Sequence, residues 1–197
     1  MNSQHEFVLR TVEERDIRFI RLWFTDILGA LKSVVMSPSE LESAFEEGVG
    51  FDGSSIEGFS RISESDTLAL PDPSTFQIMP FDQDDPDIIS ARMFCDIAQP
   101  DGQPSMVDPR HILRRQVTES ANEGFTCMAA PEIEFYLLEQ SLDNTNLIAT
   151  DNGGYFDQAT HDRAPSFRRR AMSALEAMSI ATEFSHHETA PGQQEID

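Results

Sequence analysis

Hydrophobic and polar positions at the start of the chain predict a helix followed by a β-hairpin. Residues 4–15 place apolar side chains among charges, as an amphipathic helix does. The apolar residues of this segment are Phe7, Leu9 and Val12. Residues 17–24 read IRFIRLWF, a run rich in β-branched and aromatic residues whose two arginines are typical of a strand with one exposed face. A turn at 26–29 separates this strand from another at 31–36, so we expect the two to pair.

A second helix is expected to begin near residue 37. Ser37 can cap it and Pro38 suits its first position. Glu40 lies where it would complete a capping box, and Gly48 is placed to end the helix.

The next segments predict a loop and then short strands. Residues 48–65 contain many glycines and serines, so we expect no regular element there. Strands separated by Asp and Pro are expected at 66–70, 76–81 and 90–97. Residues 1–103 therefore predict a small α+β unit built on a mixed sheet.

The second half predicts a further domain over residues 104–197. Residues 99–104 are the expected linker, and Asp108 with Pro109 caps a helix that runs to about Glu123, with Gly124 as its stop. The remaining expected elements are one or two strands in 125–139, a polar loop at 140–163, a helix at 165–178 and a strand at 180–188. The chain stops at residue 197, where the pattern predicts the start of another strand, so we expect it to be a fragment of a longer protein.

Charge and composition narrow the classes of function. Fourteen Lys and Arg against thirty-five Asp and Glu give a formal net charge of −21. A field of that sign repels nucleic acid and anionic membranes, and it favours metal ions. There is no secretory signal at the N-terminus and no run of the roughly 18 apolar residues that a membrane span needs. With only Cys95 and Cys127, the sequence is typical of a cytoplasmic protein.

Two glutamates lie two positions apart in an otherwise apolar strand. The alternation of a strand places Glu132 and Glu134 on one face, with Ile133 and Phe135 on the other. A bound cation would neutralise this pair of like charges. The alternative is an exposed strand face that carries two solvated acids.

A second acidic group follows in residues 183–195. Pro191 and Gly192 predict a turn that lets Glu188 and Glu195 face each other across adjacent strands. If these strands lie beside the one with Glu132 and Glu134, four carboxylates converge, and oxygen ligands select Mg²⁺ or Mn²⁺ over Zn²⁺.

Two qualifications apply to this acidic group. We favour a supporting role for His186 and His187 over direct metal binding. Glu183 and Glu188 are an odd number of positions apart, so on a regular strand they face opposite sides. They share a site only if a bulge or a strand end lies between them.

Two glycine-rich segments are weaker signals. In Gly50-Phe51-Asp52-Gly53-Ser54, the flexible backbone could present Asp52 to a ligand, although a plain Asx turn is the better interpretation of the segment taken alone. Gly153-Gly154-Tyr155-Phe156 predicts only a loop with an aromatic pair.

Taken in order, four motifs resemble the bacterial type I glutamine synthetases, and the resemblance runs from end to end of the chain. The motifs are Phe51-Asp52-Gly53-Ser54-Ser55, Pro131-Glu132-Ile133-Glu134-Phe135, Gly153-Gly154-Tyr155-Phe156-Asp157, and His186-His187-Glu188 followed by Gly192-Gln193-Gln194-Glu195. The short spacing from Glu188 to Glu195 is similar to the α subdivision. The resemblance implies a small N-terminal β-grasp-like domain, followed by the start of a larger antiparallel-sheet catalytic domain.

The resemblance also implies an activity and a set of metal ligands. The family joins ammonia to the γ-carboxyl of L-glutamate with ATP, through γ-glutamyl phosphate, and uses two divalent ions per site, Mg²⁺ or Mn²⁺. By resemblance, Glu134, Glu188 and Glu195 hold one ion, Glu132 helps to hold the second, and Glu183 lies at the nucleotide.

Other implied features concern the first domain and the assembly. Asp52 would reach the active site of a neighbouring subunit and take a proton from ammonium. Arg61 matches the position used for glutamine feedback in the α type, with a surface ion pair as the alternative. The family forms dodecamers, and we expect residues 1–197 alone to be inactive.

Two other functions remain open from the sequence. One is a γ-glutamyl-polyamine or other amine ligase of the same superfamily, although Asp52 and its intact loop favour ammonium. The other is a non-catalytic scaffold of similar fold. The four retained glutamates argue against a scaffold, because it has no use for concentrated negative charge.

Overall fold

The computed structural model describes residues 3–56, 66–81, 87–139, 147–158 and 164–197. The chain forms two compact units, Met1–Cys127 and Met128–Asp197. None of the helices in the described ranges has the length and apolar character that crossing a membrane requires.

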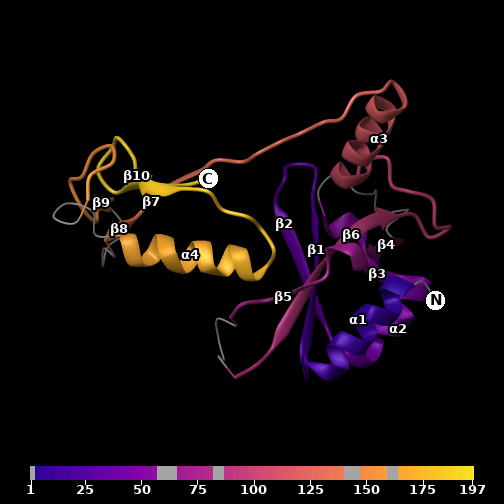
Figure 1. Ribbon diagram of the computed structural model, residues 1–197. Coiled ribbons are helices and arrows are strands. Elements are labelled where there is room, and N and C mark those ends of the chain that lie inside the picture. Colours follow the sequence, from indigo (N-terminus) through magenta and orange to yellow (C-terminus); the bar gives the residue numbers. More distant parts are fainter. Residues whose placement is uncertain (1–2, 57–65, 82–86, 140–146, 159–163) are drawn as a thin grey trace. The chain divides into compact units, whose positions relative to one another are not determined.

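A mixed sheet forms the centre of the first unit (Figure 1). Its strand order is β2-β1-β6-β4-β3, and β5 pairs separately with β6. Only β1 and β6 run parallel, and the other pairs are antiparallel. The strands are β1 (Phe19–Thr25), β2 (Leu31–Met36), β3 (Val49–Asp52), β4 (Asp66–Pro71), β5 (Gln77–Ile78) and β6 (Ser90–Ala98).

Two helices cover one face of this sheet. They are α1 (Ser3–Glu14) and α2 (Leu41–Glu47), which lie side by side in Figure 1. Val8 of α1 and Leu41 of α2 are fully buried in one cluster with Leu22 of β1 and Met93 of β6. Burial alternates along β1, so Ile20, Leu22 and Phe24 point into this core as the period of a strand requires. The predicted α+β unit with its N-terminal helix and hairpin is confirmed.

The structure corrects three local predictions in this unit. Val49–Asp52 forms β3 within the predicted loop. Local propensity does not favour a strand there, but pairing with β4 supplies hydrogen-bond partners for its backbone. The strand expected at 76–81 is reduced to Gln77–Ile78. Ser37 makes no capping bond from its side chain; Pro38–Glu40 instead forms a short 3-10 helix (η1) before α2, which ends at Gly48 as predicted.

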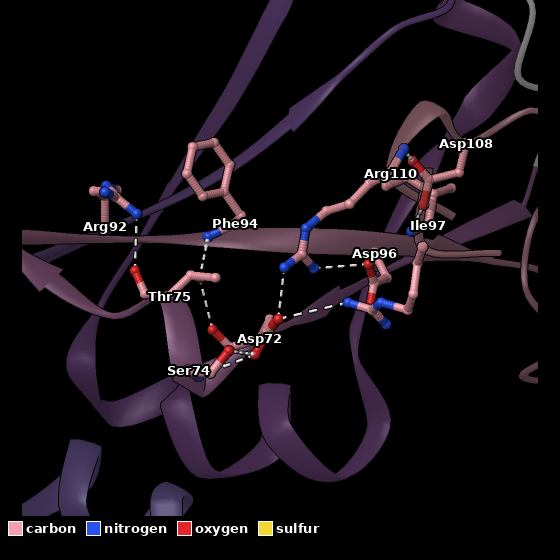
Figure 2. Close-up of polar contacts among 10 residues, drawn as sticks. Asp72, Ser74, Thr75, Arg92, Phe94, Asp96, Ile97, Asp108 and Arg110 are labelled. Carbon is pink, nitrogen blue, oxygen red and sulfur yellow. Dashed lines mark hydrogen bonds and ion pairs between the residues drawn. The ribbon is translucent and has the colours of Figure 1, made fainter. Parts of the chain in front are cut away.

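A third helix, α3 (Pro109–Asn122), is attached to β6 by charged side chains (Figure 2). The guanidinium group of Arg110, in the first turn of α3, lies 2.7 Å from an Asp96 oxygen and 2.6 Å from an Asp72 oxygen. Asp108 is almost fully buried, caps the helix at the Arg110 amide and accepts from the Ile97 amide at 3.0 Å. These contacts hold α3 on the first unit.

In its described residues, the second unit contains a three-stranded antiparallel sheet, a two-stranded antiparallel pair and one helix. The sheet order is β10 (Ser185–His187), β11 (Gln193–Ile196) and β7 (Ile133–Tyr136). The two-stranded pair consists of β8 (Leu138–Glu139) and β9 (Ile148–Ala149), and the helix is α4 (Pro165–Ala177).

Most elements predicted in this unit are present, with shorter strands. α4 matches the predicted helix, and β7 with β8 confirms two strands in 125–139. β10 covers only three residues of the predicted 180–188 strand, and β9 lies within the predicted polar loop. A two-residue strand such as β9 exists through its partner β8, so local sequence patterns do not reveal it.

The Asp72–Arg110 contact generates a prediction for acid stability. Burial raises the pKa of Asp72, but hydrogen bonds from Arg110 and Ser74 outweigh it and hold this pKa below its usual range. The ionised Asp72 therefore stabilises the folded state at a pH above the pKa that this carboxyl has in the unfolded chain. The stabilisation is lost as the pH falls to the lower pKa that it has in the folded state. We expect Asp72→Asn to lower the unfolding free energy by about 1–2 kcal/mol at neutral pH, with the difference shrinking below about pH 4.

Urea unfolding followed by fluorescence of Trp23, the single tryptophan, measures this effect. Asp101→Asn is a matched control, because Asp101 accepts a similar local bond from the Gln103 amide at 3.0 Å. A difference for Asp72→Asn that stays constant from neutral pH to about pH 2 would contradict the assignment.

Candidate functional site

Pairing in the three-stranded sheet places three titratable side chains in one row. In the register of the ladders, His186 of β10 lies opposite Glu195 of β11, and Glu195 lies opposite Glu134 of β7. Residues directly opposite in antiparallel strands share a face of the sheet. The strand that carries Glu195 thus pairs with the strand that carries Glu134, as the sequence analysis expected.

Three of the side chains near this row form a compact group of donors. One atom from each of His186, Glu188 and Glu195 lies within 4.8 Å of the other two. The His186 ring reaches both acids, with Nδ1 3.6 Å from a Glu188 oxygen and Nε2 3.5 Å from a Glu195 oxygen. Among the residues that the structure describes, this is the one group whose donors could hold a metal ion.

The two carboxyl groups of this cluster interact directly. A hydrogen bond with Glu188 raises the pKa of Glu195 to about 7, and burial and the nearby charge of Asp197 act in the same direction. The amide of Thr189 donates to Glu188 at 2.9 Å and, with the bond to Glu195, lowers the pKa of Glu188. The opposite shifts are those expected of two adjacent carboxylates, because ionising one makes it harder to ionise the other.

This donor set fits a divalent cation. Two carboxylates and an imidazole can bind such an ion, and an ion between them would relieve the repulsion between the two acids. His186 is a donor that the sequence analysis did not favour, since residue order alone does not reveal which strand faces its ring.

Glu134 lies beside this cluster in the register of the sheet, and Glu132 comes two positions before it. Glu134 is exposed, and its Oε2 accepts a hydrogen bond from Gln193 Nε2 at 2.6 Å. Glu132 is exposed and lies one residue before β7. The alternation of a strand, which predicted that Glu132 and Glu134 share a face, therefore does not extend to Glu132. Gln193 is a contact that the sequence analysis missed.

Glu183 lies outside β10 on the side opposite Glu188. Its amide donates to the Asp197 carbonyl at 2.7 Å, and its side chain is exposed. Because β10 covers only Ser185–His187, both Glu183 and Glu188 lie beyond its ends. The strand end that the odd spacing requires is therefore present.

Asp52 belongs to the first unit. It caps the 3-10 helix Gly53–Ser55 (η2), accepting from the Ser54 amide at 3.0 Å and the Ser54 hydroxyl at 2.6 Å. The hydroxyl bond is the largest cause that lowers the pKa of Asp52, so this exposed carboxylate is ionised at neutral pH. Arg61 lies outside the described residues.

The face of the sheet opposite the donor cluster packs on α4. Gln194 and His187 are fully buried there, and Arg168 of α4 donates from Nη1 to Gln194 Oε1. The rings of Phe135 and Phe167 lie 5.5 Å apart. One face of the sheet thus carries the acids while the other is fixed by a helix.

Comparisons with known proteins agree with this architecture. Residues 16–100 match the family described as glutamine synthetase, beta-Grasp domain, and residues 106–197 match glutamine synthetase, catalytic domain. A glutamine synthetase of Mycolicibacterium smegmatis is 66% identical over 100% of this chain, and that of Mycobacterium tuberculosis strain H37Rv is 64% identical. This chain spans 44% of the length of each of these relatives.

A solved structure shows the same fold. The cryo-EM structure of Plasmodium falciparum glutamine synthetase superposes with a TM-score of 0.82 at 22% identity, covering 99% of this chain and 44% of that one. The predicted β-grasp domain followed by the start of a catalytic domain is confirmed. With nearly all of its residues matched by the two domains of one family, the chain belongs to the glutamine synthetase family.

Proposed function

We propose that this chain is the N-terminal portion of an enzyme that joins ammonia to the γ-carboxyl of L-glutamate with ATP, through γ-glutamyl phosphate. The observation that carries the proposal is the His186, Glu188 and Glu195 cluster beside Glu134, in a chain 66% identical to a glutamine synthetase. The proposed enzyme is a cytoplasmic dodecamer of the type I α subdivision. The spacing from Glu188 to Glu195 supports the subdivision.

In this proposal the carboxylates of the second unit hold two divalent ions, Mg²⁺ or Mn²⁺. Glu134, Glu188 and Glu195 bind the first ion, Glu132 contributes to the second, and Glu183 contacts the nucleotide. Bound divalent ions neutralise phosphate charge during phosphoryl transfer. The glutamates therefore bind and orient two anionic substrates that a bare acidic site would repel.

Asp52 and Arg61 have proposed roles in the first unit. Ammonium is not a nucleophile, and an ionised carboxylate both attracts this cation and accepts its proton. The capped, exposed Asp52 carboxylate supports this role at the active site of a neighbouring subunit. Arg61 is proposed to sense glutamine.

We place the domain boundary between residues 103 and 104. The two family matches, which end at residue 100 and resume at residue 106, support this position. In the structure α3 nevertheless packs with the first unit, because Arg110 and Asp108 hold it to β6.

The function is tested in a completed chain, in which residues 1–197 replace the aligned part of the Mycolicibacterium smegmatis relative. We expect phosphate release from ATP that requires glutamate and ammonium, and no turnover by residues 1–197 alone. A folded completed chain that releases phosphate only with a polyamine would favour an amine ligase. No release with any amine would contradict the proposed ligase activity.

Metal binding provides a separate prediction. We expect Glu195→Gln to weaken Mn²⁺ binding to the completed chain at least about 10-fold, because a neutral amide replaces a charged ligand. Electron paramagnetic resonance (EPR) of free Mn²⁺ measures the dissociation constant. Glu176→Gln, the same change at an exposed position of α4, is the control. Equal affinities in the two variants would remove Glu195 from the metal site.

The role of Asp52 predicts a loss of rate with normal metal binding. We expect Asp52→Asn to lower kcat with ammonium by about 10²–10⁴-fold, because the amide cannot accept the proton. The Mn²⁺ dissociation constant of this variant should equal that of the parent. Asp101→Asn removes a charge that accepts a similar bond from an amide two residues further on, and it should leave kcat unchanged. A kcat of Asp52→Asn within about 2-fold of the parent would exclude the role.

A further inference from the structure

His187 lies between two residues of the donor cluster but points to the other face of the sheet. It follows His186 and precedes Glu188, and its side chain is completely buried. Its Nδ1 lies 2.7 Å from the Glu188 carbonyl oxygen, and its Nε2 lies 2.7 Å from Asp151 Oδ1. Both partners are hydrogen-bond acceptors, so the ring is held from two sides.

Asp151 joins three segments of the second unit through one oxygen atom. Besides the His187 ring, its Oδ1 accepts from the amides of Gly153 and Gly192, each at 3.0 Å. Gly192 belongs to the turn between β10 and β11. Asp151 is nearly buried, and these hydrogen bonds outweigh burial and hold its pKa at about 2. An ionised carboxylate therefore ties the loop, the strand and the turn together.

Both backbone groups of Glu188 are held by this arrangement. Its carbonyl accepts from His187, and its amide donates to the Gln193 carbonyl at 2.8 Å across the turn that Asp151 holds. The Glu188 side chain thus starts from a fixed backbone, although the residue lies outside a regular strand.

The loop that follows Asp151 is shaped to the two histidines. A Cβ at Gly153 would lie 2.7 Å from His187 Nε2, so the ring occupies space that a larger residue would fill. The Phe156 amide donates to the His187 carbonyl at 3.0 Å. The rings of Tyr155 and Phe156 pack edge-on against His186, at 5.3 and 4.7 Å between centroids.

We propose that Asp151 and His187 are positioning residues that fix the backbone of Glu188 and the following turn, so that the cluster keeps its ligand geometry before an ion binds. The inference rests on the proposed metal site of the ligase. Neither residue contacts the ion; each acts through Glu188 and the turn. A preorganised site binds more tightly because less ordering accompanies binding, and partners behind metal ligands typically change affinity by about 10–100-fold.

The test measures Mn²⁺ binding to the completed chain by EPR. In Asp151→Asn the single oxygen that accepts from the His187 ring and from both glycine amides loses its charge, so all three hydrogen bonds weaken together. We expect Asp151→Asn and His187→Gln each to weaken Mn²⁺ binding by about 10–100-fold and to broaden the spectrum of the bound ion. The double variant should bind no worse than the weaker single variant, because both changes break one contact.

Asp157→Asn is the matched control in the same loop. Asp157 accepts from the Gly154 amide at 2.8 Å, a local bond within the loop. This variant should bind Mn²⁺ like the parent. Amide hydrogen exchange in β10 and β11 shows whether each variant retains the sheet.

The outcomes separate the two proposals. If the parent binds no Mn²⁺ and Glu195→Gln changes nothing, the proposed metal site fails and there is nothing to position. If the parent binds Mn²⁺ and Asp151→Asn binds it as tightly as Asp157→Asn does, the positioning role alone is overturned. A loss of amide protection in Asp151→Asn with unchanged Mn²⁺ affinity and spectrum would likewise reduce Asp151 to a purely structural role.

Discussion

The pairing of β11 with two neighbours is the constraint on which the candidate site depends. β11 lies between β10 and β7, so its register sets which side chains of three segments share a row. A slip of one residue would turn Glu195 to the α4 face and bring Gln194 to the cluster. The buried Gln194, held by Arg168, opposes such a slip because it would lose its partner and its burial.

The two faces of this sheet differ in how their charged side chains are paired. On one face, Glu188 and Glu195 lie close enough for each to shift the pKa of the other. On the other, the His187 ring contacts Asp151 Oδ1 and the Glu188 carbonyl, and Oδ1 also accepts from two glycine amides. Repulsion between the acids would spread them apart if their backbone were free. In the proposed positioning role, the contact between His187 and Asp151 behind the sheet opposes this spreading.

The fold illustrates which local signals are reliable. α1, α3 and α4, the hairpin of β1 and β2, and the stop signals at Gly48 and Gly124 follow from periodicity and chain-ending residues. β3 and β9 were missed because each is stabilised by its ladder with a partner strand. The expected capping box failed because Pro38–Glu40 forms a 3-10 turn, in which Ser37 makes no side-chain cap.

The sequence by itself determined the types of chemistry and their spacing. It placed the acids at 132, 134, 188 and 195, the turn at Pro191-Gly192, and the family resemblance. Only the tertiary structure decided that His186 joins Glu188 and Glu195, that Gln193 contacts Glu134, and that Asp151 lies behind Glu188. Spacing along a strand fixes a face, but the neighbour across a ladder follows from register, and Glu134 and Glu195 are paired although 61 positions separate them (195 − 134). The Asp151 to His187 contact spans 36 positions, so no local pattern reveals it.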